Sequence, residues 1–236
     1  MSVSAGKRVL VTGASGFVGA HIACGLTNAG FDLIALAGQR AVPEEVAATG
    51  AKVFKADLSD PLQVSAIFKS ECPEVVVHVA ALANAGVCEK DPALAERCNV
   101  AAVKNIVAAV NTLASPPTLI QFSTDLVFDG NAQASKGGFT EADEPEPCSI
   151  YGKSKRAGEQ IILEETANGV VLRASLVYGR AIGGQEGFLG WIRSGLSSKR
   201  SVTLFADEWR TPILVDDITR AVIALVSRST ANPESG

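Results

Sequence analysis

Residues 8–19 read RVLVTGASGFVG, a short apolar run followed by glycines at every third position. The run over Arg8–Thr12 is rich in β-branched side chains, which is typical of a buried strand. We expect a helix to follow over residues 19–29 and to end at Gly30. Glycines between a strand and a helix permit a tight turn and let the backbone approach a pyrophosphate, which the free N–H groups of the helix N-terminus favour. The stretch therefore predicts a dinucleotide-binding loop, with a purely structural turn as the alternative.

Strand-like and helix-like patterns alternate along the rest of the chain. Strands are expected over residues 8–12, 31–36, 52–55, 75–79, 118–123 and 170–176. Helices are expected over residues 19–29, 44–49, from 60 onward, 93–113 and 154–167, and the long loop 129–149 is expected to be functional. This alternation is typical of a parallel sheet covered on both faces.

We therefore predict an α/β fold with a Rossmann-type, doubly wound parallel sheet over residues 1–177. A small substrate-binding lobe is expected over residues 178–236, with a terminal helix from Asp216 that packs back on the first domain. The ending 231–236 has the composition of a loop that stops short of another strand. The chain is expected to be either a minimal member of its class or a truncated one.

Composition excludes several classes of protein. Of 236 residues, 47% are hydrophobic and 19% charged, which is typical of a packed globule. The net charge of −4 and the lack of a basic run argue against nucleic acid as a partner. The longest apolar runs are far too short to cross a bilayer, and the first of them is a strand rather than a signal peptide. We expect a small-molecule substrate and no membrane partner.

Cysteines and histidines give no sign of a metal site. The five cysteines form no C-x-x-C pair, so we interpret them as small core side chains in a reducing, cytoplasmic compartment. They are Cys24, Cys72, Cys88, Cys98 and Cys148. The two histidines, His21 and His78, lie in apolar segments without a second ligand nearby. No metal is expected.

The end of the second expected strand bears on the choice of cofactor. NAD-binding folds place an acid there to hold the ribose diol, but residues 37–40 read AGQR. Arg40 is suited to a 2′-phosphate, which favours NADP(H) over NAD(H), although a solvated surface arginine is the alternative. Asp57 follows the third strand, where we expect a contact with adenine.

Two further patterns indicate proton chemistry. Tyr151 and Lys155 are four residues apart at a helix start and share one face. An ammonium close to a phenol lowers the phenol's pKa from about 10, which makes the tyrosine a usable general acid or base. Thr124 directly follows the expected strand 118–123, on the ligand-binding edge of a parallel sheet, and its hydroxyl is placed to bind a substrate carbonyl. A turn-capping role is the alternative for Thr124.

With these residues in place, the chain resembles the extended short-chain dehydrogenase/reductase family, most closely its sugar-nucleotide-binding, dTDP-4-dehydrorhamnose reductase branch. The passages that carry the resemblance are 122–130 (FSTDLVFDG), 139–141, 151–155 with Gly158 and Glu159, 210–212 and 215–217, together with 77–82, Cys88, Glu89 and Asn99. The resemblance covers nearly the whole chain, but relatives continue for several tens of residues beyond it. The missing acid after the second strand is the other departure.

The resemblance implies an NAD(P)H-dependent reductase of a keto group, most closely one on a nucleotide-linked sugar. Its catalytic set corresponds to Thr124, Tyr151 and Lys155, with tyrosine as proton donor, lysine on the nicotinamide ribose and threonine orienting the substrate. The implied cofactor contacts, with Gly19 and Arg40 added from the motifs above, are Gly13, Ser15, Gly16, Phe17, Val18, Asp57, Leu58, Ala80, Ala81, Leu82, Asn99, Tyr151 and Lys155. The expected substrate contacts are Thr124, Asp125, Val127, Phe128, Tyr151, Trp191 and Arg210.

Two other functions stay open. The regulatory subunit of methionine adenosyltransferase resembles the same branch and acts by binding a partner enzyme. A reductase of a small carbonyl compound without a nucleotide is the third possibility. An intact Thr–Tyr–Lys set favours an enzyme, since a pure binding module has no need of it. A homodimer is expected as the assembly.

Overall fold

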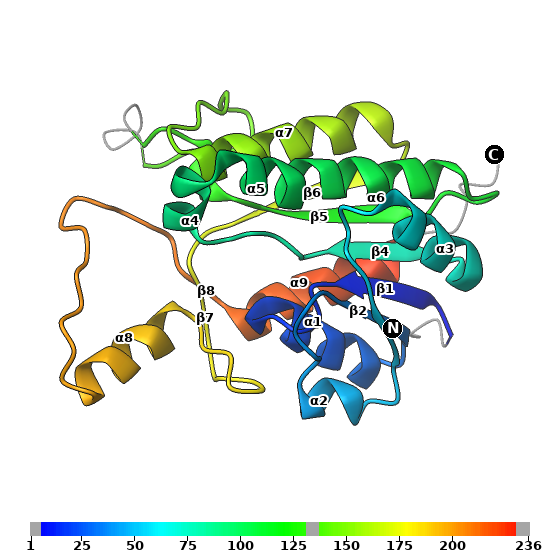
Figure 1. The fold of residues 1–236 in the computed structure, drawn as a ribbon, viewed down its shortest axis with the longest axis horizontal. Helices are drawn as coiled ribbons and strands as arrows, with labels where there is room; N and C mark the ends of the chain where they lie inside the picture. Colours follow the sequence, from blue (N-terminus) through cyan, green and yellow to red (C-terminus); the bar gives the residue numbers. More distant parts are fainter. Residues whose placement is uncertain (1–5, 131–136, 230–236) are drawn as a thin grey trace.

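The computed structural model describes residues 6–130 and 137–229. Its centre is a six-stranded parallel sheet in the order β3-β2-β1-β4-β5-β6 (Figure 1). The strands are β1 (Arg8–Thr12), β2 (Asp32–Ala37), β3 (Lys52–Lys55), β4 (Val75–His78), β5 (Thr118–Thr124) and β6 (Gly169–Ala174). This is the strand order of a doubly wound nucleotide-binding sheet, in which the strand order reverses between β1 and β4 while all strands stay parallel. The predicted fold class is confirmed.

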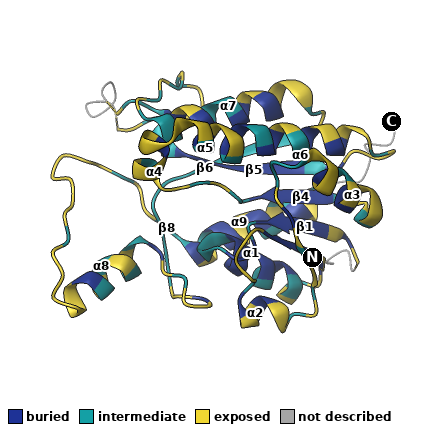
Figure 2. Ribbon diagram, in the orientation of Figure 1, coloured by how far each residue is buried: buried dark blue, intermediate teal, exposed yellow. Residues whose placement is uncertain are grey.

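Two layers of helices cover the sheet, because alternate side chains of each strand face opposite sides. Val9, Val11 and Val75 belong to the core beneath one layer, and Leu10, Val76 and Leu119 to the core beneath the other. The first layer contains α1 (Phe17–Asn28), α2 (Glu44–Ala47) and α9 (Val215–Arg228), and the second α3 (Pro61–Glu71), α6 (Ala102–Asn111) and α7 (Ile150–Glu165). Figure 2 shows the sheet buried between them.

The last helix, α9, packs beside α1 (Figure 1). A side chain at Gly25 has no room there, because its Cβ would lie 2.3 Å from Cγ2 of Thr219. The buried Lys7 ammonium donates to the carbonyl oxygen of Val226 at 3.0 Å and also to that of Ser229. Lysine thus satisfies carbonyls that a helix leaves unpaired at its C-terminus. The division of the chain after residue 177 stays a prediction.

The prediction of one continuous α-helix over residues 93–113 is wrong for the middle of that segment. Instead of one α-helix, the segment contains α5 (Pro92–Glu96), a π-helical stretch η1 (Arg97–Ala101) and then α6. The π stretch carries Asn99, whose amide oxygen accepts from the Leu82 N–H at 2.8 Å. π-Helical turns are rare and occur mostly at functional sites. The π-helical stretch η1 therefore lies where the second helix layer contacts the loop after β4, at the edge of the sheet.

Helix α7 and one short helix also differ from the expectation. Helix α7 begins at Ile150 rather than at residue 154, because the Ser149 hydroxyl caps it by accepting from the Gly152 N–H at 3.0 Å. Tyr151 consequently lies in the first helical turn. The short helix α4 (Ala85–Lys90), capped by Asn84, was not predicted. Asn84 is a strong N-cap residue and is the signal that was overlooked.

Beyond β6 the chain forms a projecting arm. Strand β7 (Val177–Tyr178) pairs in parallel with β8 (Ile213–Leu214), and between them lie α8 (Phe188–Ser197) and the segment 198–212. Figure 1 shows α8 and this segment standing away from the sheet. Exposed apolar side chains are frequent here, and Trp209 is 93% exposed. Residues 231–236, expected to form an interrupted loop, lie outside the described residues.

The cysteine prediction is only partly correct. All five thiols are free and Cys88 is buried, but Cys72 and Cys148 are exposed. Cys72 lies just after α3 in the left-handed region, with a φ of 43°, where no core is available to cover it. Among the described residues, no helix is long and apolar enough to cross a bilayer.

Candidate active site

The glycine loop between β1 and α1 is as tight as predicted. A Cβ on Gly13, whose φ is +70°, would lie 2.8 Å from the Ala80 nitrogen, and one on Gly19 would lie 2.2 Å from the Gly13 oxygen. The Gly16 N–H donates to that same oxygen at 2.9 Å. No side chain caps α1, so the N–H groups of its first turn face outward for an anion. These residues fit a pyrophosphate.

The remaining predicted residues of the loop are placed by packing. Ser15 is 8% exposed and lies inside the turn. Phe17 and Val18 form the first turn of α1, and the Phe17 ring meets His21 edge-on at 5.0 Å between centroids. A Cβ on Gly187, beyond β7, would lie 2.8 Å from the Phe17 ring. The chain after β7 therefore crosses directly over the start of α1.

The loop after β4, with Ala80, Ala81 and Leu82, lies against the glycine loop. The Thr12 hydroxyl oxygen accepts from the Ala80 N–H at 3.2 Å and lies 2.7 Å from Nδ1 of His78. The Asn99 amide accepts from and donates to the backbone of Leu82, at 2.8 and 3.2 Å. The residues predicted to contact the cofactor after β1, after β4 and on η1 are thus brought together at the sheet edge.

Two residues that sequence analysis missed hold this arrangement. The Ser154 hydroxyl accepts from Asn99 Nδ2 at 2.9 Å and donates to the Tyr151 carbonyl at 2.7 Å, so it ties η1 to α7. Its place between Tyr151 and Lys155 was the available signal. His78 is the other, and its Nε2 has no hydrogen-bond partner among the described residues. Burial, with a smaller effect of the Lys155 charge, lowers the pKa of His78 to about 3, so this ring is neutral.

Arg40, Asp57 and Leu58 lie at the carboxyl ends of β2 and β3, on the same edge as the glycine loop. Arg40 is exposed, and its Nη1 donates to Oε1 of Gln185 at 2.6 Å. Hydrogen bonds from Ser59, first from its hydroxyl at 2.8 Å and then from its N–H at 2.9 Å, lower the pKa of Asp57. The carboxylate therefore stays charged beside the expected adenine position.

Tyr151 and Thr124 meet at the end of β5. The Thr124 hydroxyl lies near the Tyr151 phenol and favours its ionised form, while it donates to Oδ1 of Asp125 at 3.2 Å and accepts from the Leu126 N–H at 3.1 Å. Thr124 is 5% exposed. Burial raises the pKa of Tyr151 to about 12, and the neighbouring Cys88 and Asp125 act in the same direction. Such a phenol is protonated at neutral pH, which is the state a proton donor requires.

Lys155 lies one helical turn after Tyr151 and is 3% exposed. Burial lowers the pKa of Lys155 to about 8, and Glu159 one turn further along opposes this shift. The expectation that Lys155 lowers the pKa of Tyr151 is wrong for this structure. The pKa of the phenol rises, because its removal from water outweighs the favourable effects of Arg210 and Thr124.

A buried ion cluster behind Lys155 was not predicted as part of the site. The Glu159 carboxylate is fully buried and accepts from Arg173 Nε at 3.0 Å and Nη2 at 2.8 Å. Arg156 adds a third contact to it at 3.3 Å. The guanidinium of Arg173 also lies 5.1 Å from the centre of the Phe128 ring. The cluster therefore joins the helix that carries Lys155 to the chain after β5.

The expected substrate contacts divide into two groups. Asp125 and Arg210 lie beside Tyr151 and form an ion pair with each other, which the Ser175 hydroxyl joins at 2.5 Å from Asp125. Val127 is fully buried, so its side chain is covered by protein. Phe128 stacks on Phe139 at 4.5 Å.

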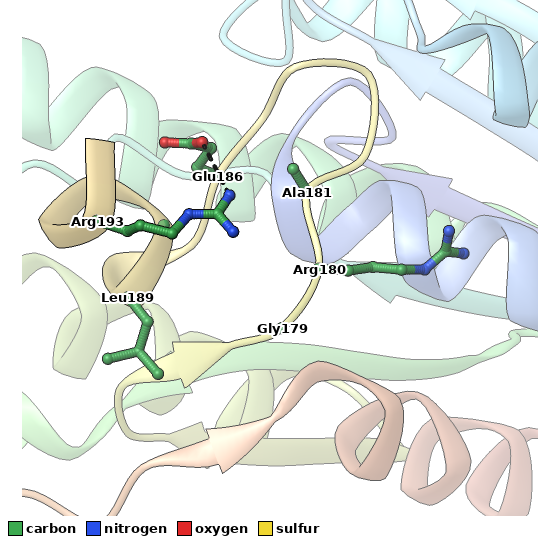
Figure 3. Close-up of a pocket in the computed structure, with 7 residues that line it drawn as sticks. Gly179, Arg180, Ala181, Glu186, Leu189 and Arg193 are labelled. Atoms are coloured by element: carbon green, nitrogen blue, oxygen red, sulfur yellow. Dashed lines mark ion pairs between the residues drawn. The ribbon is translucent and has the colours of Figure 1, made fainter. Parts of the chain in front are cut away.

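Trp191, the remaining expected substrate contact, does not lie with the residues around Tyr151. It lies on α8 with its ring 6.0 Å from that of Phe188. Near it, between β7 and α8, is a cavity of about 240 Å³ (Figure 3), whose polar side chains are Arg180, Glu186 and Arg193. Glu186 and Arg193 pair at 3.9 Å, while Arg180 points away from them. No sequence pattern had singled out this cavity.

Residues 7–236 match the model of the RmlD substrate binding domain. The chain belongs to the RmlD substrate-binding-domain family. Several of its relatives and structural neighbours are named as reductases or epimerases, so the predicted membership in a family of NAD(P)-dependent oxidoreductases is confirmed.

Two curated relatives differ in kind. The chain is 28% identical over 218 residues to a probable low-salt glycan biosynthesis reductase of Haloferax volcanii, covering 92% of this chain and 69% of the relative. It is 33% identical over 173 residues to the methionine adenosyltransferase 2 subunit beta of Rattus norvegicus, covering 73% of this chain and 48% of the relative. The chain thus spans less than half the length of the second protein.

Two solved structures that are similar to this chain contain a bound nicotinamide cofactor. The dTDP-4-dehydrorhamnose reductase of Bacillus anthracis, in complex with NADP, is 25% identical with a TM-score of 0.77, over 94% of this chain and 71% of that one. The UDP-glucose 4-epimerase of Thermus thermophilus, in complex with NAD, is 29% identical with a TM-score of 0.81, over 94% and 75% of the two chains.

Proposed function

We propose that this protein uses NADPH to reduce a keto group on a nucleotide-linked sugar. The observation that carries the proposal is the meeting of Thr124, Tyr151 and the buried Lys155 at the same sheet edge as the glycine loop. The family and the reductases among its relatives support the same substrate class. A cytoplasmic location and a homodimer stay predictions.

The cofactor would be held along the edge between β1 and β4. The glycine loop and the first turn of α1 would bind the pyrophosphate, Arg40 the 2′-phosphate and Asp57 the adenine side. NADP and NAD in two solved relatives support this placement. When bound, the nicotinamide cofactor supplies a hydride, while the protein supplies position and proton.

The protein's own residues divide the remaining work. Tyr151, whose pKa of about 12 keeps it protonated, donates its phenolic proton to the substrate's carbonyl oxygen. The Thr124 hydroxyl, which lies near that phenol, orients the carbonyl. Lys155 is proposed to bind the nicotinamide ribose. The Asp125–Arg210 pair borders the same space and is a candidate contact for the sugar.

A panel of keto-sugar nucleotides tests the proposal. Oxidation of NADPH should be seen with at least one of them, and Tyr151→Phe should bind NADPH normally yet lose about 10²–10⁴-fold in turnover. The phenylalanine retains the packing of the ring and removes only the proton donor. Turnover by Tyr151→Phe at the parent rate would rule out tyrosine as the donor.

A second function is favoured by the 33% identity to a methionine adenosyltransferase subunit. In that case the chain binds a partner enzyme and the Thr–Tyr–Lys set is idle. Failure of the whole sugar panel, together with tight binding to a methionine adenosyltransferase catalytic subunit in a pull-down, would favour this function over the first.

A further inference from the structure

A short hairpin after β7 lies against the loop that follows β2. Ile182 and Gln185 exchange two backbone hydrogen bonds, at 3.1 and 2.8 Å, around a turn in which Gly183 and Gly184 have φ of 52° and 71°. Two successive left-handed residues define a tight type I′ turn, so the position of Gln185 is well determined. The hairpin is therefore a rigid unit rather than a loose loop.

Three contacts fasten this hairpin to the segment that carries Arg40. Ile182 is 3% exposed and belongs to the same core as Val46 of α2. The Gly183 N–H donates to the Glu45 carboxylate at 3.3 Å. A Cβ on Gly183 would lie 2.4 Å from the Pro43 ring, so the two segments are in direct contact there. The hairpin and the loop after β2 thus form one surface, although 145 positions separate Arg40 from Gln185.

Gln185 then reaches the Arg40 side chain. Its amide oxygen accepts from Nη1 at 2.6 Å, which leaves Nε and Nη2 of the guanidinium for an anion. A long arginine at an exposed position loses much rotamer freedom when it binds a phosphate. Holding it beforehand reduces that loss, which is how preorganisation raises affinity.

We infer that Gln185 is a positioning residue for cofactor selection: it orients Arg40 toward the 2′-phosphate of NADPH and so raises the preference for NADPH over NADH. This rests on the proposed function, specifically on Arg40 as the phosphate contact. The segment after β7 would then contribute to the selectivity for NADPH over NADH, in addition to any contact with the substrate.

The dissociation constants of NADPH and NADH, measured by fluorescence titration on the full chain, test the inference. Arg40→Ala should abolish most of the NADPH preference. Gln185→Ala should raise the dissociation constant of NADPH about 3- to 10-fold and that of NADH by less, as expected for the loss of one hydrogen bond that orients a charged group. The double variant should behave like Arg40→Ala, because Gln185 acts only through Arg40.

The exposed Gln160 on α7 provides a matched control, and Gln160→Ala should leave both constants unchanged. A loss of NADPH preference in Arg40→Ala without any in Gln185→Ala would overturn the inference and leave the proposed function standing. Equal affinities for the two cofactors in the parent protein would overturn both. Equal weakening of NADPH and NADH by Gln185→Ala would also overturn the inference, since it indicates damage to the fold.

Discussion

Arg210 donates two hydrogen bonds to Asp125, from Nε at 2.7 Å and from Nη2 at 2.6 Å. Asp125 follows β5 beside Thr124 and Tyr151, whereas Arg210 lies just before β8 at the end of the projecting segment. A paired arginine and carboxylate in this geometry is specific as well as attractive. The pair therefore fastens the arm to the carboxyl-terminal edge of the sheet, beside Thr124 and Tyr151.

Breaking this pair should cost measurable stability. In a double-mutant cycle of Arg210→Ala and Asp125→Asn, we expect a coupling energy of about 1–2 kcal/mol, since both side chains are partly buried. The matched control is the exposed Arg220–Asp217 pair, where the coupling should stay below about 0.5 kcal/mol. Urea unfolding followed by circular dichroism measures both, and equal couplings would contradict the structural role.

Removal of the buried carboxylate should be more costly. Glu159→Gln leaves Arg173 without its counterion, and we expect a loss of about 3 kcal/mol in the free energy of unfolding. Glu159→Met combined with Arg173→Met should recover part of it, because Arg173 no longer leaves a charge without its counterion and Arg156 keeps its pair with Glu144. Glu71→Gln is the control, because Glu71 pairs with the largely exposed Lys52. This variant should lose less than about 1 kcal/mol in the free energy of unfolding. No difference between the two single variants would refute the cluster.

The pKa of Lys155, lowered to about 8 by burial, predicts a dependence of stability on pH. Between that value and the ordinary 10.5, the unfolded chain binds a proton that the folded chain lacks. The free energy of unfolding should therefore rise with pH across this window and fall as pH drops toward 8, by up to about 3 kcal/mol. Lys155→Met lacks this contribution, so subtracting its urea-derived stability isolates it. A flat difference would mean that the lysine is not buried.

The glycine loop predicts a selective loss of cofactor binding. Valine at Gly16 fits the local φ of −94° and starts 3.3 Å from the Gly13 oxygen, so Gly16→Val should fold but fill the space a pyrophosphate needs. NADPH titration should then give no saturable signal. Gly19→Ala is the contrasting variant, because its Cβ would lie 2.2 Å from that oxygen and should destabilise the fold itself. Saturable NADPH binding by Gly16→Val would place the cofactor elsewhere.

Thiol reactivity should follow burial. In the native protein, Cys72 and Cys148 should react rapidly with a disulfide reagent, since both are exposed. Cys88 is buried and its pKa is raised by burial, so it should react only after unfolding. Counting the fast-reacting thiols in Cys72→Ser and Cys148→Ser variants assigns them. A fast reaction that persists when both are replaced would show that a further thiol is accessible.

Much of the fold could be predicted because its signals are local. The β-branched run before Gly13 and the glycine spacing after it specify a strand and a turn through backbone sterics alone, and β1 and α1 form where expected. Helix ends that depend on a single cap were less certain, as Ser149 and Asn84 show. The π-helical stretch at Asn99 escaped prediction because its cause is a pair of contacts to the distant Leu82.

The sequence by itself therefore determined the sheet and the glycine loop, and it predicted Thr124, Tyr151 and Lys155 as the candidate catalytic residues. Only the tertiary structure decided what surrounds them. Asp125 meets Arg210, Glu159 meets Arg173, and the pKa of Tyr151 rises rather than falls. Strand and turn propensities act between neighbours along the chain, whereas desolvation and ion pairing depend on which distant side chains packing brings together and on how much water it removes.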